Sequence, residues 1–129
     1  MSAYTLRNLR DVEDQAAKHG LGPALQARFP FGELDADQTG LSLQRLAPGE
    51  RLPFAHRHDE AEEVYVIVSG SGRIKLDDDI VEVGPMDAIR VAPTVTRALE
   101  GGPEGIEYLA VGQHHDGDGA VQPIEEFWP

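Results

Sequence analysis

The chain has 129 residues, with no cysteine, five histidines, and 23 Asp and Glu against 11 Lys and Arg, for a formal net charge of −12. This length is sufficient for one domain with a hydrophobic core, and the absence of cysteine excludes disulfides, thiolate zinc sites, iron–sulfur clusters and cysteine nucleophiles. The negative charge argues against nucleic acids and anionic membranes as partners, because both carry phosphate. Since no apolar leader opens the chain, we expect a cytoplasmic protein.

Residues 1–39 are predicted to form an N-terminal arm. Residues 8–20 have the features of a short helix, because Asn8 can cap the first turn, apolar residues recur at helical spacing, and Gly20 offers a left-handed stop. Residues 23–29 are predicted to add a second helical turn that begins at a proline.

From Gly40 onward the hydrophobic period changes to two, which is typical of strands. Turn residues separate the apolar runs, including the Ser-Gly-Ser-Gly segment at 69–72 and the three aspartates at 77–79. Many short strands at close spacing indicate an all-β sandwich or barrel. The predicted strands are residues 41–46, 55–57, 63–68, 72–76, 80–83, 87–91 and 106–111, with a further strand at 95–99.

The chain shows no internal repeat or linker, so we expect a single domain over residues 1–129. In this domain the β-barrel core spans residues 40–112, and residues 113–129 form a polar C-terminal tail. Phe127 and Trp128, near the end of the tail, are expected to pack on the barrel or on a partner subunit, because exposing both would be costly.

The segment around His56 carries the strongest chemical signal in the sequence. His56 and His58 are two residues apart, so on a strand both imidazoles point to the same face. Glu63, at the start of the next predicted strand, can return a carboxylate to that face, whereas Glu62 points the opposite way. Two imidazoles and one carboxylate suit a divalent metal, and non-haem iron oxygenases use such a set with open positions. A charged strand end on the surface is the alternative interpretation.

His56, one residue, His58, four residues, Glu63, six residues and Gly70 together resemble the first signature motif of the cupin superfamily. The resemblance extends over residues 40–112. It implies a cupin-type β-barrel, or jelly roll, with a short helical arm before it, and a homodimer. It also implies that His56, His58 and Glu63 bind a divalent metal ion in the mouth of the barrel, with Zn, Fe, Mn and Ni all open as its identity.

The second cupin motif is degenerate in this chain. In the register that fits best, Asp87, Val91 and Pro93 keep its general pattern, but Arg97 stands where the third metal-binding histidine belongs. A guanidinium stays protonated and has no lone pair for a metal. Either Arg97 swings aside and leaves a three-ligand site, or it enters the pocket, pairs with Glu63 and replaces the metal.

The resemblance further implies that a small organic molecule binds beside the metal. Arg97, whose forked donors suit a carboxylate or phosphate, and Tyr65 are predicted to contact this ligand. Three functions stay open: a metal-dependent oxygenase or isomerase, a module that binds a small molecule without turnover, and a metal-free binding or structural cupin. The cupin fold alone does not choose between an enzyme and a binding protein.

Overall fold

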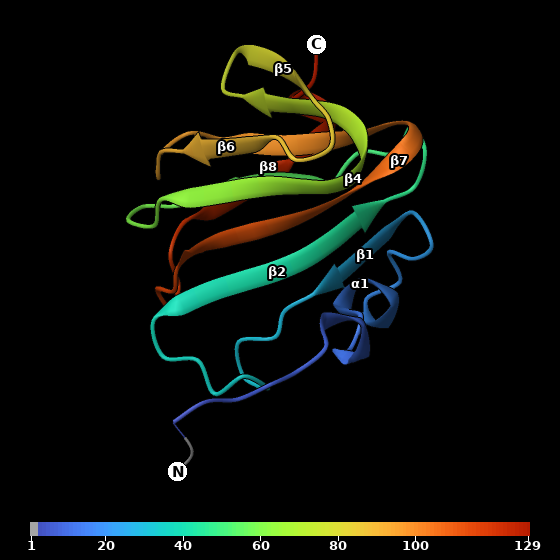
Figure 1. Cartoon of the computed structure of the whole chain (residues 1–129). Helices are drawn as coiled ribbons and strands as arrows, with labels where there is room; N and C mark the ends of the chain where they lie inside the picture. The colour runs from blue at the N-terminus through green and yellow to red at the C-terminus, as the bar shows by residue number, and fades with distance from the viewer. Residues whose placement is uncertain (1–2) are drawn as a thin grey trace.

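The computed structural model describes residues 3–129. Within this range eight strands are hydrogen-bonded into one curled sheet, which confirms the predicted all-β fold (Figure 1). Two long strands, β4 (Glu63–Leu76) and β7 (Arg97–Gln113), run antiparallel to each other through its middle. The shorter strands are β1 (Leu25–Arg28), β2 (Thr39–Leu46), β3 (Phe54–Arg57), β5 (Asp79–Val83), β6 (Ala88–Val91) and β8 (Ala120–Pro123).

The two long strands take different neighbours at their two ends, and this curls the sheet. β4 pairs with β6 through residues 63–66 and with β5 through residues 72–76. β7 pairs with β2 through residues 106–113 and with β3 at Arg97. β1 extends the sheet beyond β2, and β8 extends it beyond β3. The buried apolar side chains of these strands form one core cluster inside the curl.

The turn predicted at residues 69–72 is wrong, because β4 runs through this segment as one strand with two irregularities in its pairing to β7. Gly70 has a φ of +74°, and a Cβ on it would lie 2.2 Å from the carbonyl oxygen of Gly105. These glycines therefore allow two strands to approach closely at a bulge and do not reverse the chain. The predicted turn at residues 77–79 is confirmed in position, since Asp77 and Asp78 connect β4 to β5.

The N-terminal arm differs from its prediction in two places. The expected helix over residues 8–20 is divided into a 3-10 turn, η1 (Leu9–Asp11), and one short turn of helix, α1 (Gln15–Lys18). The division falls at Asp14, whose Oδ1 accepts hydrogen bonds from the backbone N–H groups of Ala16 and Ala27 and so ties α1 to β1. The second predicted helical turn is in fact β1, which pairs with β2 and buries alternate residues.

The C-terminal tail is more ordered than the predicted polar loop, because it contains β8 and a 3-10 turn, η2 (Ile124–Glu126). The expected packing of its two aromatic residues is confirmed: Phe127 and Trp128 are both buried and belong to the core cluster. No helix among residues 3–129 is long and apolar enough to cross a membrane.

Candidate metal site

The three predicted metal ligands lie together. His56 is on β3, His58 follows the end of that strand, and Glu63 opens β4. One ligand atom from each lies within 4.8 Å of the other two. Glu63 Oε1 is 3.7 Å from His56 Nε2, and Glu63 Oε2 is 3.6 Å from His58 Nε2. Ligands of a tetrahedral metal with bonds of about 2.0–2.2 Å are roughly 3–3.5 Å apart, so this group needs only a small contraction to hold an ion.

Glu63 is the most extensively hydrogen-bonded side chain of the group. Its Oε1 accepts a hydrogen bond of 2.7 Å from the Tyr65 hydroxyl and one of 2.9 Å from Arg97 Nη2. Burial raises the pKa of Glu63, but hydrogen bonds from His56, Tyr65 and Arg97 outweigh it and lower the pKa to about 2. Glu63 is therefore a carboxylate over the whole working range of pH. The pKa of Tyr65 is raised, first by burial and then by the charge of Glu63, so its hydroxyl stays a hydrogen-bond donor.

Arg97 points into the interior of the barrel and pairs with Glu63, and this pairing agrees with that part of the second alternative from the sequence. It pairs in register with His56 across β3 and β7 and is fully buried. Its remaining donors reach the Tyr65 hydroxyl at 3.2 Å and the backbone oxygens of Pro93 and Val95 at 3.2 and 2.8 Å. The ion pair therefore occupies Oε1 of Glu63 and leaves Oε2 turned toward His58.

One nitrogen of the His58 ring shows that these residues fit a metal ion. Its Nε2 is buried and has no hydrogen-bond partner. On the other side of the ring, Nδ1 lies 3.3 Å from the backbone oxygen of Asp118 and 3.4 Å from its Oδ2. An unpartnered imidazole nitrogen facing a carboxylate and a second imidazole is the donor set that a divalent metal completes, so the residues present fit the ion.

Asp118 contacts His58, and the sequence analysis did not predict this contact. Sixty residues separate it from His58, and the two meet only because β8 pairs with β3 and brings the preceding loop back to the ligand segment. An aspartate between two glycines at 117 and 119 is an ordinary loop pattern, so no local signal marks it.

A large cavity of about 840 Å³ opens beside the three ligands, and Tyr65 lines it together with them. Arg97 is not among its lining residues. The N-terminal arm forms one wall, through α1 and β1. Much of the cavity lining, from the arm and from the barrel, is apolar: Leu21, Leu25, Ala27, Phe29, Leu52, Phe54, Ala110 and Val121.

The other histidines and acidic groups do not join the metal cluster. His114 stacks on Phe31 with ring centroids 3.9 Å apart, and His115 Nδ1 lies 3.4 Å from Glu60. Glu62, immediately before β4, is exposed and faces Arg90, whereas Glu63 turns to His56, His58 and Arg97. No second group of three possible ligands occurs among residues 3–129.

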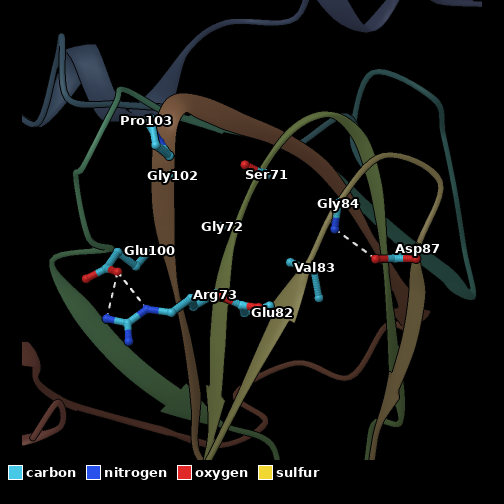
Figure 2. Close-up of a pocket in the computed structure, with 10 residues that line it drawn as sticks. All are labelled: Ser71, Gly72, Arg73, Glu82, Val83, Gly84, Asp87, Glu100, Gly102 and Pro103. Carbon is cyan, nitrogen blue, oxygen red and sulfur yellow. Dashed lines mark hydrogen bonds and ion pairs between the residues drawn. The ribbon is translucent and has the colours of Figure 1, made fainter.

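A separate cavity of about 580 Å³ lies between the β4–β5 pair and the bend of β7. Figure 2 shows that its polar groups bind one another: Arg73 reaches across to Glu100, and Asp87 turns to the backbone N–H of Gly84. Because Arg73, Glu100 and Asp87 are paired in this way, they do not form a group of metal ligands like the one around Glu63.

The chain is similar to several known proteins. A search of curated proteins found no match. Among solved structures, a cupin protein from Bacteroides fragilis matches with a TM-score of 0.73 and 23% identity, over 91% of this chain and 89% of that one. The polyketide cyclase RemF from Streptomyces resistomycificus matches with a TM-score of 0.70 and 23% identity, over 93% and 84% of the two chains. A single-residue variant of the oxalate decarboxylase of Bacillus subtilis matches with a TM-score of 0.68 and 25% identity, over 84% of this chain but 30% of that one.

These structures agree in fold and differ in their named activities, so they support the architecture and leave the reaction to the residues of the site. The model of the cupin domain family matches residues 42–111, more than half of the chain, and this range contains His56, His58 and Glu63. The curled sheet, the His56–His58–Glu63 group and this match lead to one conclusion: the chain belongs to the cupin family.

Proposed function

We propose that this protein binds a divalent metal ion through His56, His58 and Glu63 and a small organic molecule in the adjoining cavity. The observation that carries the proposal is the buried, unpartnered Nε2 of His58, 3.6 Å from Glu63 Oε2. A buried polar atom without a partner is costly in a folded protein, and a metal ion would remove that cost.

The cavity supports a ligand with an apolar body and at least one oxygen atom. Its walls are mainly aliphatic and aromatic, whereas the polar side chains of the metal group gather at one place. Arg97 is fully buried and its donors are engaged by Glu63, Tyr65 and backbone oxygens. In our proposal Tyr65 therefore borders the ligand, and the predicted contact of Arg97 with it becomes an indirect one, through Glu63.

When bound, the ion would act as a Lewis acid toward an oxygen of the ligand, which is the chemistry an oxygenase or an isomerase needs. The chain's own residues have separate tasks. Glu63 stays ionised beside Arg97, Tyr65 donates its hydroxyl hydrogen to Glu63, and the apolar walls exclude water around the ligand.

Metal analysis tests this proposal directly. Purified protein is loaded with Zn²⁺, desalted and measured by inductively coupled plasma mass spectrometry, beside His56→Ala, His58→Ala and the control His114→Ala, whose imidazole lies outside the cluster. We expect about one ion per chain in the wild type and the control, and a loss of most of the ion in the other two variants. Equal and near-zero occupancy in all four proteins contradicts a metal function.

The ion pair between Arg97 and Glu63 favours a second candidate, a metal-free cupin that binds a small molecule in the same cavity. The probe for ligand binding is 2,3-dihydroxynaphthalene, a flat apolar molecule with two oxygen atoms. A rise in Tm that depends on loaded Zn²⁺ supports the first candidate, whereas an equal rise in metal-free wild-type protein and in His58→Ala supports the second.

A further inference from the structure

Asp118 lies in the loop between β7 and β8, and 5% of its side chain is exposed. It turns two oxygen atoms toward the same nitrogen of His58: its backbone oxygen lies 3.3 Å from Nδ1, and its Oδ2 lies 3.4 Å from it. Both oxygens can only accept hydrogen bonds. A hydrogen on Nδ1 is therefore stabilised, whereas a lone pair there would face two oxygens.

A neutral imidazole carries a single ring hydrogen, so the state of Nδ1 decides the state of Nε2. With the hydrogen on Nδ1, the lone pair is on Nε2, the buried atom that faces Glu63 Oε2 and has no other partner. Histidines that bind metals generally donate their second nitrogen to a carboxylate or a backbone carbonyl, which fixes both the tautomer and the ring orientation.

The carboxylate of Asp118 is itself held in place by the segment that follows His58. Its Oδ1 accepts hydrogen bonds from the backbone N–H groups of Asp59 at 2.6 Å and Glu60 at 3.0 Å, and its Oδ2 accepts one from Ala61 at 3.0 Å. The oxygen atoms that face His58 are thus held in position by the backbone of residues 59–61.

The close approach of this loop to the ligand segment depends on a glycine. Gly119 has a φ of +101°, and a Cβ on it would lie 1.9 Å from the backbone oxygen of Arg57. Gly119 therefore lies against the backbone of Arg57, just before His58, while Asp118 accepts hydrogen bonds from residues 59–61, just after it.

We propose that Asp118 is a positioning residue of the metal site, which holds His58 in the tautomer with hydrogen on Nδ1 and presents Nε2 to the ion. This inference rests on the proposed metal function. It adds a fourth residue, 60 positions after His58 and near the C-terminal end of the chain, to a site otherwise built from residues 56–63.

The tautomer can be measured in metal-free protein labelled with ¹⁵N-histidine, at a pH where the imidazole is neutral. We expect hydrogen on Nδ1 of His58 in the wild type. In Asp118→Asn, Oδ1 can still accept from Asp59 and Glu60. The NH₂ group that replaces Oδ2 loses the hydrogen bond from Ala61, faces Nδ1 and opposes a hydrogen there. We expect the population to shift toward hydrogen on Nε2, and the Zn²⁺ affinity by calorimetry to fall about 10- to 100-fold.

The matched control is Asp116→Asn, in the same loop, where the side chain is exposed and pairs with His114. This control should change neither the His58 tautomer nor the Zn²⁺ affinity. Asp118→Ala is the second variant: it removes the carboxylate without adding a donor. It should lower the Zn²⁺ affinity while the backbone spectrum outside residues 57–61 and 117–119 stays unchanged.

Two results would overturn the inference: hydrogen on Nε2 of His58 in the wild type, or an unchanged tautomer and Zn²⁺ affinity in both Asp118 variants. A wild type that shows the expected tautomer, loses it in Asp118→Asn and yet binds no Zn²⁺ is a different outcome. It would support the control of the tautomer by Asp118 and overturn the proposed metal function.

Discussion

Glu63 contacts both the buried arginine and the histidines of the candidate metal site. One of its oxygens serves Arg97 and Tyr65, and the other faces His58. The guanidinium offsets the charge of the carboxylate, so His56, His58, Glu63 and Arg97 together carry no net charge when the imidazoles are neutral. A divalent ion bound there would keep its full double charge, which weakens its binding and strengthens its action as a Lewis acid.

Arg97→Met tests this balance of charge. Breaking a buried ion pair costs about 3–5 kcal/mol, so we expect the unfolding free energy of the metal-free protein to fall, as measured by chemical denaturation. Without the guanidinium, nothing offsets the negative charge of Glu63. We therefore expect the Zn²⁺ affinity of the Arg97→Met protein, measured by calorimetry, to rise by about 10-fold or more. The control is Arg90→Met, which removes a guanidinium from an exposed pair with Glu62. A lower or unchanged affinity in Arg97→Met would show that the guanidinium does not oppose the ion.

At the scale of elements, the sequence predicted that His56, His58 and Glu63 share one face, and it did not predict the contacts between distant segments. The spacing of His56 and His58 fixes their common face on any strand, and the carboxylate at Glu63 is five residues further on. Asp118 becomes visible only once β8 is paired with β3. The same limit explains why β1 was predicted as a helical turn. Its four residues alternate in burial, but so short a segment cannot be distinguished from a helical turn until it pairs with β2.

Gly70 allows a test of the bulge that keeps β4 continuous. Gly70→Ala must place a Cβ at a φ of +74° and 2.2 Å from the backbone oxygen of Gly105. We expect the unfolding free energy to fall by about 1–3 kcal/mol for the backbone conformation, with the steric contact adding to it. Gly84→Ala is the control, since nothing lies within 4 Å of a Cβ there, and its unfolding free energy should change by less than about 0.5 kcal/mol. Equal denaturation midpoints for the two variants would contradict this role of Gly70.

At the scale of the whole molecule, the N-terminal arm closes one side of the cavity beside His56, His58 and Glu63, and in Figure 1 it lies beside β2. A bidentate ion pair attaches the arm to β7, the neighbour of β2: Arg10 donates to the two oxygens of Glu107 at 2.6 and 2.7 Å. The hydrogen bond from Arg10 is the largest cause of the lowered pKa of Glu107, ahead of the opposing effect of burial.

This ion pair predicts how the stability depends on pH. A carboxylate whose pKa is lowered by folding stabilises the protein above its ordinary value of 4.5 and loses that contribution as the pH falls through its lowered value. We therefore expect Glu107→Gln to reduce the loss of stability between neutral and acidic pH, measured by thermal unfolding across a pH series. Glu104→Gln, at an exposed position of the same strand, is the control and should follow the wild type. A wild-type slope in Glu107→Gln would exclude the pair as a determinant of acid stability.

The homodimer implied by the family resemblance is also a property of the whole molecule, and it stays a prediction. Several apolar side chains remain on the surface of the chain, with Met86 and Val121 79% and 69% exposed. We expect sedimentation equilibrium to give twice the mass of one chain. A single-chain mass at micromolar concentration would contradict the prediction.

The C-terminus provides a built-in optical probe. Trp128 is the single tryptophan of the chain, and its ring is contacted by the guanidinium groups of Arg51 and Arg73 at 4.7 and 5.3 Å. Both of these arginines also bind Glu100. Fluorescence of the unmodified protein therefore reports on the attachment of its last residues, with no label needed. An affinity tag is better placed at the other end, because a tag after Pro129 would begin one residue from this buried ring.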